Sequence, residues 1–146
     1  MQFVYGGPPY RIETKRLVMR CWDPSHAALL ERTIRESRET LLPWMPWART
    51  NSEDLRPRIR SLRKFRSAFD SDKDYVYGIF DTSEARVLGG CGLHKRLGPY
   101  AFEIGYWIGT SYQRKGYATE VGLGLIKTGF ELFDVDRIEV HCDERN

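Results

Sequence analysis

The chain has 146 residues, of which 41% are hydrophobic and 29% charged, and its formal net charge is +3. This composition excludes a disordered chain and suits one globular domain, which we expect to span residues 1–146. No apolar run approaches the ~18 residues of a membrane helix. An odd number of cysteines without a C-x-x-C pair favours a reducing cytoplasm over a disulfide or zinc framework.

The first half of the chain predicts one strand and two helices. Residues 16–22 alternate in polarity, which places Leu17, Met19 and Cys21 on one face of a strand. Two prolines within residues 41–47 exclude a regular helix there and indicate an apolar elbow. In chain order we expect a loose arm (1–11), the strand (16–22), a helix from about 25 to 37, the elbow (41–47) and a helix from about 56 to 69.

The second half predicts three strands, a helix and a last strand. The connections between the three strands are short, so we expect them to be antiparallel. The helix carries apolar residues at helical spacing, and the strand after it requires a parallel crossover. The ranges are 74–80, 87–93 and 101–109 for the strands, 116–133 for the helix, and 137–142 for the last strand, with Ile138, Val140 and Cys142 inward. The expected fold is therefore mixed α/β (α+β), with a mostly antiparallel sheet.

Residues 112–120 read YQRKGYATE, between a strand and a helix start. A helix start presents unpaired backbone N–H groups, and Gly116 would let an anion approach them because it has no Cβ. Arg114 and Lys115 add positive charge. These groups are donors and not carboxylates, so they suit a diphosphate better than a metal. The alternative is an exposed turn with solvated basic residues, and no metal site is predicted elsewhere.

This stretch, with the strand before it, resembles a known family. The pattern QRKGYA (113–118) after EIGYWIG (103–109) is similar to the cofactor motif of the GNAT superfamily of acyl-CoA N-acyltransferases. IETKRLVMR (12–20), LLPWMPW (41–47) and IEVHCDERN (138–146) further resemble its RimJ/RimL group, which includes ribosomal-protein N-terminal alanine acetyltransferases. The four segments occur in the order of that group and cover nearly the whole chain.

The resemblance implies a GNAT fold that binds acetyl-CoA as a co-substrate and transfers its acetyl group to a primary amine. Pantetheine would lie along the fourth strand, in a gap where the fourth and fifth strands splay apart. The pyrophosphate would bind backbone amides at the helix start, and Asn146 matches a position that touches the cofactor arm. The implied cofactor-binding residues are Tyr106, Trp107, Ile108, Gln113, Arg114, Lys115, Gly116, Tyr117, Ala118, Thr119 and Asn146.

Direct transfer within a ternary complex needs a neutral amine and a proton acceptor. An α-amine, with a pKa of about 7.7–8.0, is partly neutral at cellular pH, so a carboxylate acting through water can suffice. The family often carries a base on the fourth strand, which makes Glu103 the candidate catalytic residue. The alternative is an exposed strand glutamate paired with a neighbouring basic residue. The sequence identifies no general acid.

The acceptor itself is left open between a protein N-terminus, with a ribosomal protein as one partner, and a small amine. The resemblance places Trp44 and Trp47 of the elbow beside the acceptor pocket, and His141 can reach it from the last strand. Two other functions stay open. The basic stretch LRPRIRSLRKFR (55–66) could bind RNA or the ribosome, although a solvated face is its default interpretation. A CoA-binding domain without turnover is the other.

The family continues beyond Asn146 with another helix and further strands. We therefore expect this chain to be truncated after its fifth strand, and strand 137–142 to expose an unpaired edge. Such an edge is a template for pairing, so the chain can form a homodimer through it, with impaired turnover.

Overall fold

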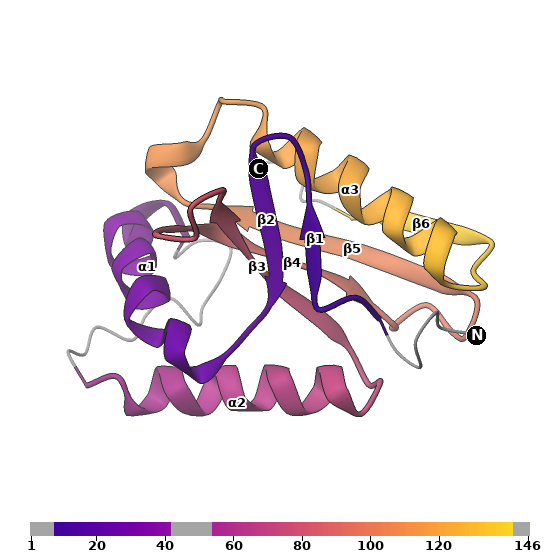
Figure 1. Ribbon diagram of the computed structural model, residues 1–146, viewed down its shortest axis with the longest axis horizontal. Coiled ribbons are helices and arrows are strands. Elements are labelled where there is room, and N and C mark those ends of the chain that lie inside the picture. The colour runs from indigo at the N-terminus through magenta and orange to yellow at the C-terminus, as the bar shows by residue number, and fades with distance from the viewer. Residues whose placement is uncertain (1–7, 42–53, 142–146) are drawn as a thin grey trace.

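The computed structural model describes residues 8–41 and 54–141 (Figure 1). Trp44, Trp47, Cys142 and Asn146, which carry sequence-based predictions, lie outside this part of the chain. Within residues 8–41 and 54–141, no helix is both long and apolar enough to cross a membrane.

The described residues form one six-stranded sheet with three α-helices (Figure 1). Strand order follows chain order from β1 to β6. All neighbours are antiparallel except β5 and β6, which are parallel. This confirms the mixed α/β fold with its crossover. The elements are β1 (Arg11–Glu13), β2 (Leu17–Cys21), α1 (Ala27–Leu41), α2 (Arg56–Asp70), β3 (Tyr75–Asp81), β4 (Val87–His94), β5 (Ala101–Ile108), α3 (Tyr117–Leu132) and β6 (Arg137–Val140).

The prediction that residues 1–11 form a loose arm is wrong at its end, because Arg11 begins β1. The cross-strand register places Arg11 opposite Arg20 of β2, a like-charge pair that would disfavour pairing by itself. Glu84, in the turn after β3, removes this repulsion by accepting from Arg11 at 2.7 Å and from Arg20 at 2.9 Å. Strand β1 therefore depends on Glu84, a residue far away in the sequence, so no local pattern around Arg11 predicts it.

Each face of the sheet has its own hydrophobic core, and Leu17, Met19 and Cys21 share one of them, as the alternation predicted. On the α3 face, Met19 and Leu17 pack with Val121 and Leu125 of α3. On the opposite face, a second core joins β2 to α1 and α2, with Trp22, Leu30, Ile34 and Leu62 among its buried members. Figure 1 shows α2 crossing one end of the sheet and α3 running beside β5 and β6. The sheet therefore separates two hydrophobic cores.

The basic helix α2 is not solvated on all its polar faces. Arg58 forms an ion pair with Glu31 of α1 at 2.8 Å, and the two side chains are only 11% and 5% exposed. One oxygen of that carboxylate, Oε1, is buried without a hydrogen-bond partner. The prediction of a solvated face is thus wrong for Arg58, while Arg60, Arg63 and Lys64 are exposed.

Glycines allow β4 and β5 to approach closely. A Cβ at Gly89 would lie 2.0 Å from the carbonyl oxygen of Trp107, and one at Gly90 would lie 2.5 Å from the Trp107 ring nitrogen. At Gly89 this is the close backbone approach that the glycines predicted, whereas at Gly90 the Trp107 side chain fills the space.

The parallel pair β5–β6 is short. It runs from Ala101↔Arg137 to Ile104↔Val140, whereas β5 continues to Ile108. Ile138 packs inward against α3 near Gly129, but Val140 is half exposed, so its predicted inward packing is only partial. In the part of the chain that the structure describes, β6 is an edge strand and residues 105–108 of β5 have no β6 partner.

Candidate functional site at the start of α3

The turn between β5 and α3 contains two residues with positive φ angles, which few residues other than glycine adopt. Arg114 has φ +61° and Gly116 has φ +81°, both in the left-handed region. Gly116 is the residue before the first turn of α3, and no side chain caps the helix there. The first intrahelical bond runs from Glu120 N–H to the Gly116 carbonyl. The backbone N–H groups of residues 117–119 therefore precede the regular hydrogen-bond pattern, at the positive end of the helix dipole.

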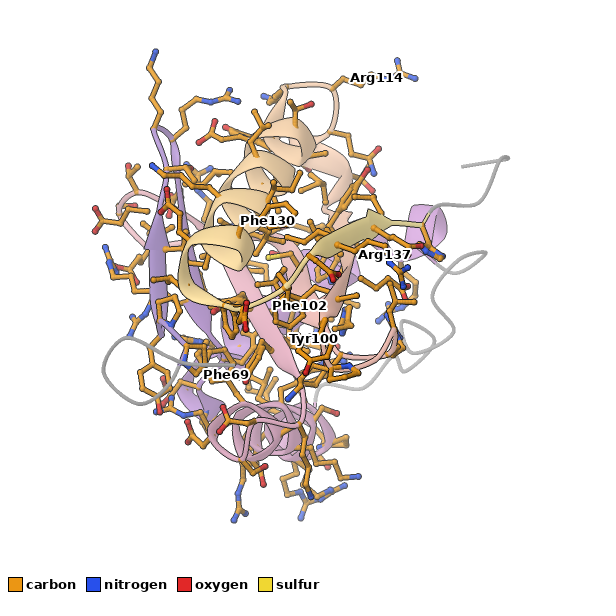
Figure 2. The ribbon with its side chains drawn as sticks, turned by 90° about the vertical axis from the view of Figure 1, so that its right-hand side faces the viewer. Phe69, Tyr100, Phe102, Arg114, Phe130 and Arg137 are labelled. Carbon is orange, nitrogen blue, oxygen red and sulfur yellow. The ribbon has the colours of Figure 1, made fainter. Side chains whose placement is uncertain are left out.

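The turn is fixed at its start by Gln113, whose side-chain amide donates to the Ile108 carbonyl at 3.1 Å. Gln113, Arg114, Lys115, Gly116 and Thr119 are exposed, and Tyr117 and Ala118 are half-buried. Figure 2 shows Arg114 extending from this turn into open space. The structure thus brings the predicted pyrophosphate-binding residues together around one exposed helix start.

Arg16, in the turn between β1 and β2, supports the same helix start and received no role from the sequence. Its guanidinium pairs with Glu120 at 2.7 Å, donates to the Lys115 carbonyl at 2.9 Å and lies 4.5 Å from the centre of the Tyr117 ring. The signal was present, because Arg16 belongs to the resembling segment 12–20 and Glu120 ends YQRKGYATE. Neither segment indicates by itself that the two meet.

Glu120 is the centre of this support. Its carboxylate accepts from the Thr14 hydroxyl and, at 2.8 Å, from the Arg16 backbone N–H. Burial raises the pKa of Glu120, but the hydrogen bonds from Thr14 and Arg16 outweigh burial and leave that pKa below its usual value. The carboxylate is therefore ionised at neutral pH and holds the β1–β2 turn against the helix start.

The end of β5 beyond its pairing with β6 leads directly into this turn. Tyr106 is 41% exposed, Trp107 is half-buried against the α1–α2 core, and Ile108 is buried. On its other side this stretch pairs with residues 89–91 of β4. On the side of β6, residues 105–108 have no partner from that strand within the described part of the chain.

A cavity of about 660 Å³ lies on the face of the sheet that carries α1 and α2. Its lining combines aromatic side chains, among them Trp22, Phe65 and Trp107, with polar groups. The polar side chains that line it are Arg58, Ser61, Asp74, His94 and Arg96. Strand β5 contributes Gly105, Tyr106 and Trp107 to this lining, so the part of β5 beyond its pairing with β6 is also a wall of the cavity.

Glu103 lies on β5 opposite His94 of β4 and Glu139 of β6. Its side chain is 19% exposed and pairs with Arg96, whose Nε is 3.3 Å from the carboxylate. This is the ion pair that the alternative interpretation describes, and it is compatible with a catalytic role. His141 is 54% exposed and lies 2.9 Å from Glu139, and it is absent from the cavity lining. Both residues stay predicted site residues.

Other reactive side chains are less suited to chemistry. Burial raises the pKa of the Cys21 thiol to about 11 and that of Cys91 further still, so both are neutral thiols near pH 7. Among residues 8–41 and 54–141, no three or more His, Cys, Asp or Glu side chains gather as metal ligands would.

Comparisons with known proteins agree with this geometry. Residues 16–146 match the acetyltransferase (GNAT) domain family. The uncharacterized N-acetyltransferase YnaD of Bacillus subtilis is 25% identical over 136 residues, which are 92% of this chain and 74% of YnaD. The solved structure of a candidate ribosomal-protein-serine acetyltransferase from Vibrio cholerae superposes with a TM-score of 0.80 at 28% identity, over 96% of this chain and 78% of that one.

A second solved structure is RimL, a ribosomal L7/L12 α-N-protein acetyltransferase in complex with coenzyme A. It superposes with a TM-score of 0.75 over 93% of this chain and 76% of RimL, and at 19% identity this likeness concerns the fold. The uncapped helix start and the short β5–β6 pairing agree with the match over residues 16–146. That match identifies the chain as a member of the GNAT acetyltransferase family, similar to its RimJ/RimL group.

Proposed function

We propose that the chain moves an acetyl group from acetyl-CoA to a primary amine, by direct attack of the amine in a ternary complex. One observation carries the proposal. Strand β5 leads into an uncapped helix start, keeps an edge free of β6 and forms a wall of the 660 Å³ cavity. An anion at the helix start, an extended arm on the strand edge and an acceptor in the cavity would thus meet at one strand.

Acetyl-CoA would be held as a co-substrate by the predicted residues. The N–H groups at the start of α3 suit a pyrophosphate, and Gly116 leaves the backbone accessible. The stretch of β5 at Tyr106, Trp107 and Ile108, beyond its pairing with β6, suits the amide groups of pantetheine. The complex of RimL with coenzyme A supports this assignment.

The acceptor would enter from the cavity on the other face. Glu103 is a candidate base acting through water, and a backbone N–H near Trp107 or Ile108 would stabilise the oxyanion. The names of the V. cholerae protein and of RimL favour a protein N-terminus, such as that of a ribosomal protein, over a small amine. Trp44, Trp47 and His141 remain predicted acceptor-side residues.

Thiol release from acetyl-CoA tests the proposal. The chain is incubated with peptides that begin with serine or alanine, with polyamines and with aminoglycosides, and the acetylated product is identified by mass spectrometry. We expect amine-dependent CoA release with a product heavier by one acetyl group. Binding of CoA without product from any amine would favour the non-catalytic alternative.

One observation favours RNA or ribosome binding as a second function. Arg60, Arg63 and Lys64 are exposed on α2 and have no ion-pair partner among the described residues. An RNA-binding surface would give an affinity that falls steeply with salt, without any thiol release. The two functions are compatible if the acceptor is a ribosomal protein.

A homodimer through the edge of β6 also remains a proposal. The half-exposed Val140 and the unpaired edge in the described part of the chain support it. Sedimentation at several concentrations measures it, and a monomer at all of them would exclude it.

A further inference from the structure

A histidine and an aspartate form a pair inside the cavity, away from the predicted cofactor residues. His94 is the last residue of β4, and Asp74 directly precedes β3. His94 Nδ1 lies 2.9 Å from Asp74 Oδ2, and the His94 side chain is 16% exposed. Both side chains line the cavity. Asp74 Oδ1 is buried without a hydrogen-bond partner, so this carboxylate has accepting capacity left.

Two glycines make room for the imidazole ring. Gly92 of β4 and Gly105 of β5 are opposite each other in the sheet register. A Cβ at Gly92 would lie 2.9 Å from His94 Nε2, and one at Gly105 would lie 3.1 Å from the same atom. The ring therefore lies over this glycine pair, with Nε2 beside Gly105. That residue is the first of β5 beyond its pairing with β6.

The contacts of the ring determine which nitrogen can accept a proton. A carboxylate facing Nδ1 accepts its hydrogen bond, so in the neutral ring Nδ1 carries the hydrogen and Nε2 carries the lone pair. No described residue forms a hydrogen bond with Nε2. Glu103, directly opposite His94, has its carboxylate engaged by Arg96 at 3.3 Å and 3.4 Å. Both groups keep lone pairs, but both oxygens of Glu103 contact a guanidinium, whereas Nε2 of His94 has no hydrogen-bond partner among the described residues.

We infer that His94, oriented by Asp74, accepts the proton of the acceptor amine during acetyl transfer. The inference rests on the proposed function and names a catalytic residue that sequence reasoning did not assign. The amine nitrogen forms a bond to the thioester carbonyl carbon and passes its proton to Nε2. The C–S bond then breaks with its electron pair on sulfur, and the imidazolium proton reaches the thiolate through water. The products are the amide and CoA, and His94 returns to its neutral form.

Asp74 is a positioning residue in this scheme. Its carboxylate fixes the ring tautomer and stabilises the imidazolium. The other charged groups near the pair are Arg58 and Arg96, which line the same cavity, and Glu103, which lies opposite His94 in the sheet register. Arg58 is paired with Glu31, and Arg96 with Glu103. Glu103 is also the alternative proton acceptor, so the experiment must separate it from His94.

The test compares H94Q, E103Q and D74N, in the full chain, with the amine that the wild type acetylates best. The rate kcat/KM is measured from about pH 5 to 9, the range in which a histidine changes charge. We expect H94Q to lose about 10²–10³-fold, within the range for a general base, and to lose the acidic limb of the profile. We expect D74N to lose less than H94Q, because its histidine ring is still present but has lost the carboxylate that orients it.

Controls separate catalysis from folding and from cofactor binding. Calorimetry should give the same CoA affinity for H94Q as for the wild type, since His94 is outside the predicted cofactor residues. A second variant, His94→Ala, should regain rate as imidazole is added, which a folding defect would not. A wild-type profile in H94Q, with the large loss in E103Q, would overturn the inference and assign the base to Glu103. A wild type that acetylates no amine would instead refute the proposed function.

Discussion

Replacing Gly116 by valine should weaken CoA binding through the backbone of the turn. Gly116 has φ +81°, where an L-residue costs about 1–2 kcal/mol. A Cβ there would also lie 3.3 Å from a guanidinium nitrogen of Arg16, and the branches of valine extend further toward that group. The variant turn would relax into other conformations, and CoA would have to reverse that relaxation on binding.

The size of the effect follows from this cost. Since about 1.4 kcal/mol is a factor of ten, 1–2 kcal/mol predicts a rise in Kd of about 5–30-fold, before any direct clash with the phosphate. Lys115→Ala removes an exposed charge near a helix start, worth about 0.3–1 kcal/mol or about 2–5-fold. The glycine variant should therefore bind CoA more weakly than the lysine variant.

Isothermal titration calorimetry with CoA measures both, and Gly98→Val is the matched control. Gly98 has φ +104° in the β4–β5 turn, and a Cβ there would meet no atom within 4 Å. It therefore carries similar backbone strain far from the helix start, and its CoA affinity should equal that of the wild type. Equal small losses of CoA affinity in the Gly116 and Lys115 variants would refute the placement of the diphosphate on this turn. A loss of CoA affinity in the Gly98 variant as large as in the Gly116 variant would refute it as well.

Two further predictions concern stability. Arg58→Met should lower the free energy of unfolding by about 3–5 kcal/mol, because it leaves the buried Glu31 carboxylate unpaired. In urea unfolding, the double variant E31M/R58M should recover most of this loss. A double variant as unstable as R58M would contradict this account. The folded-state pKa of Glu120 is lowered, so its carboxylate stabilises the folded state fully above the unfolded-state pKa of about 4.3. This stabilisation is lost as pH falls through the folded-state pKa. Thermal unfolding should show Glu120→Gln less stable than the wild type at pH 7, with the difference shrinking below about pH 4, and a difference independent of pH would exclude this carboxylate as the cause.

Local patterns were sufficient for most of the fold. The helical spacing of Val121, Leu125 and Gly129 predicted the buried face of α3, and alternation predicted the side of β2 that carries Met19. These patterns arise because one face of each element meets the core, so they are visible within one element. The turn at Gly116 was predictable for the same reason, since its motif and its left-handed backbone lie within nine consecutive residues.

The features that were missed depend on residues that meet only after folding. Arg16 supports a helix start about a hundred residues later in the sequence, through Glu120. The His94–Asp74 pair exists because the β3–β4 register brings the end of one strand beside the start of the other. The isolated histidine gave no signal, since its partner and the glycines beneath it are identifiable only when the strands are paired.

The close approach of β4 and β5 determines where this protein can open. Gly89 and Gly90 leave no space between Trp107 and β4, so β5 cannot shift toward its antiparallel neighbour. Strand β6 is held by only four paired positions and ends in a half-exposed valine. Any widening between β5 and β6 must therefore come from β6. Backbone amides of β6 should exchange with deuterium by local opening, while those between β4 and β5 exchange only when the whole sheet unfolds. The cleft for the acetyl donor would thus lie between a fixed strand, β5, and a strand that can move, β6.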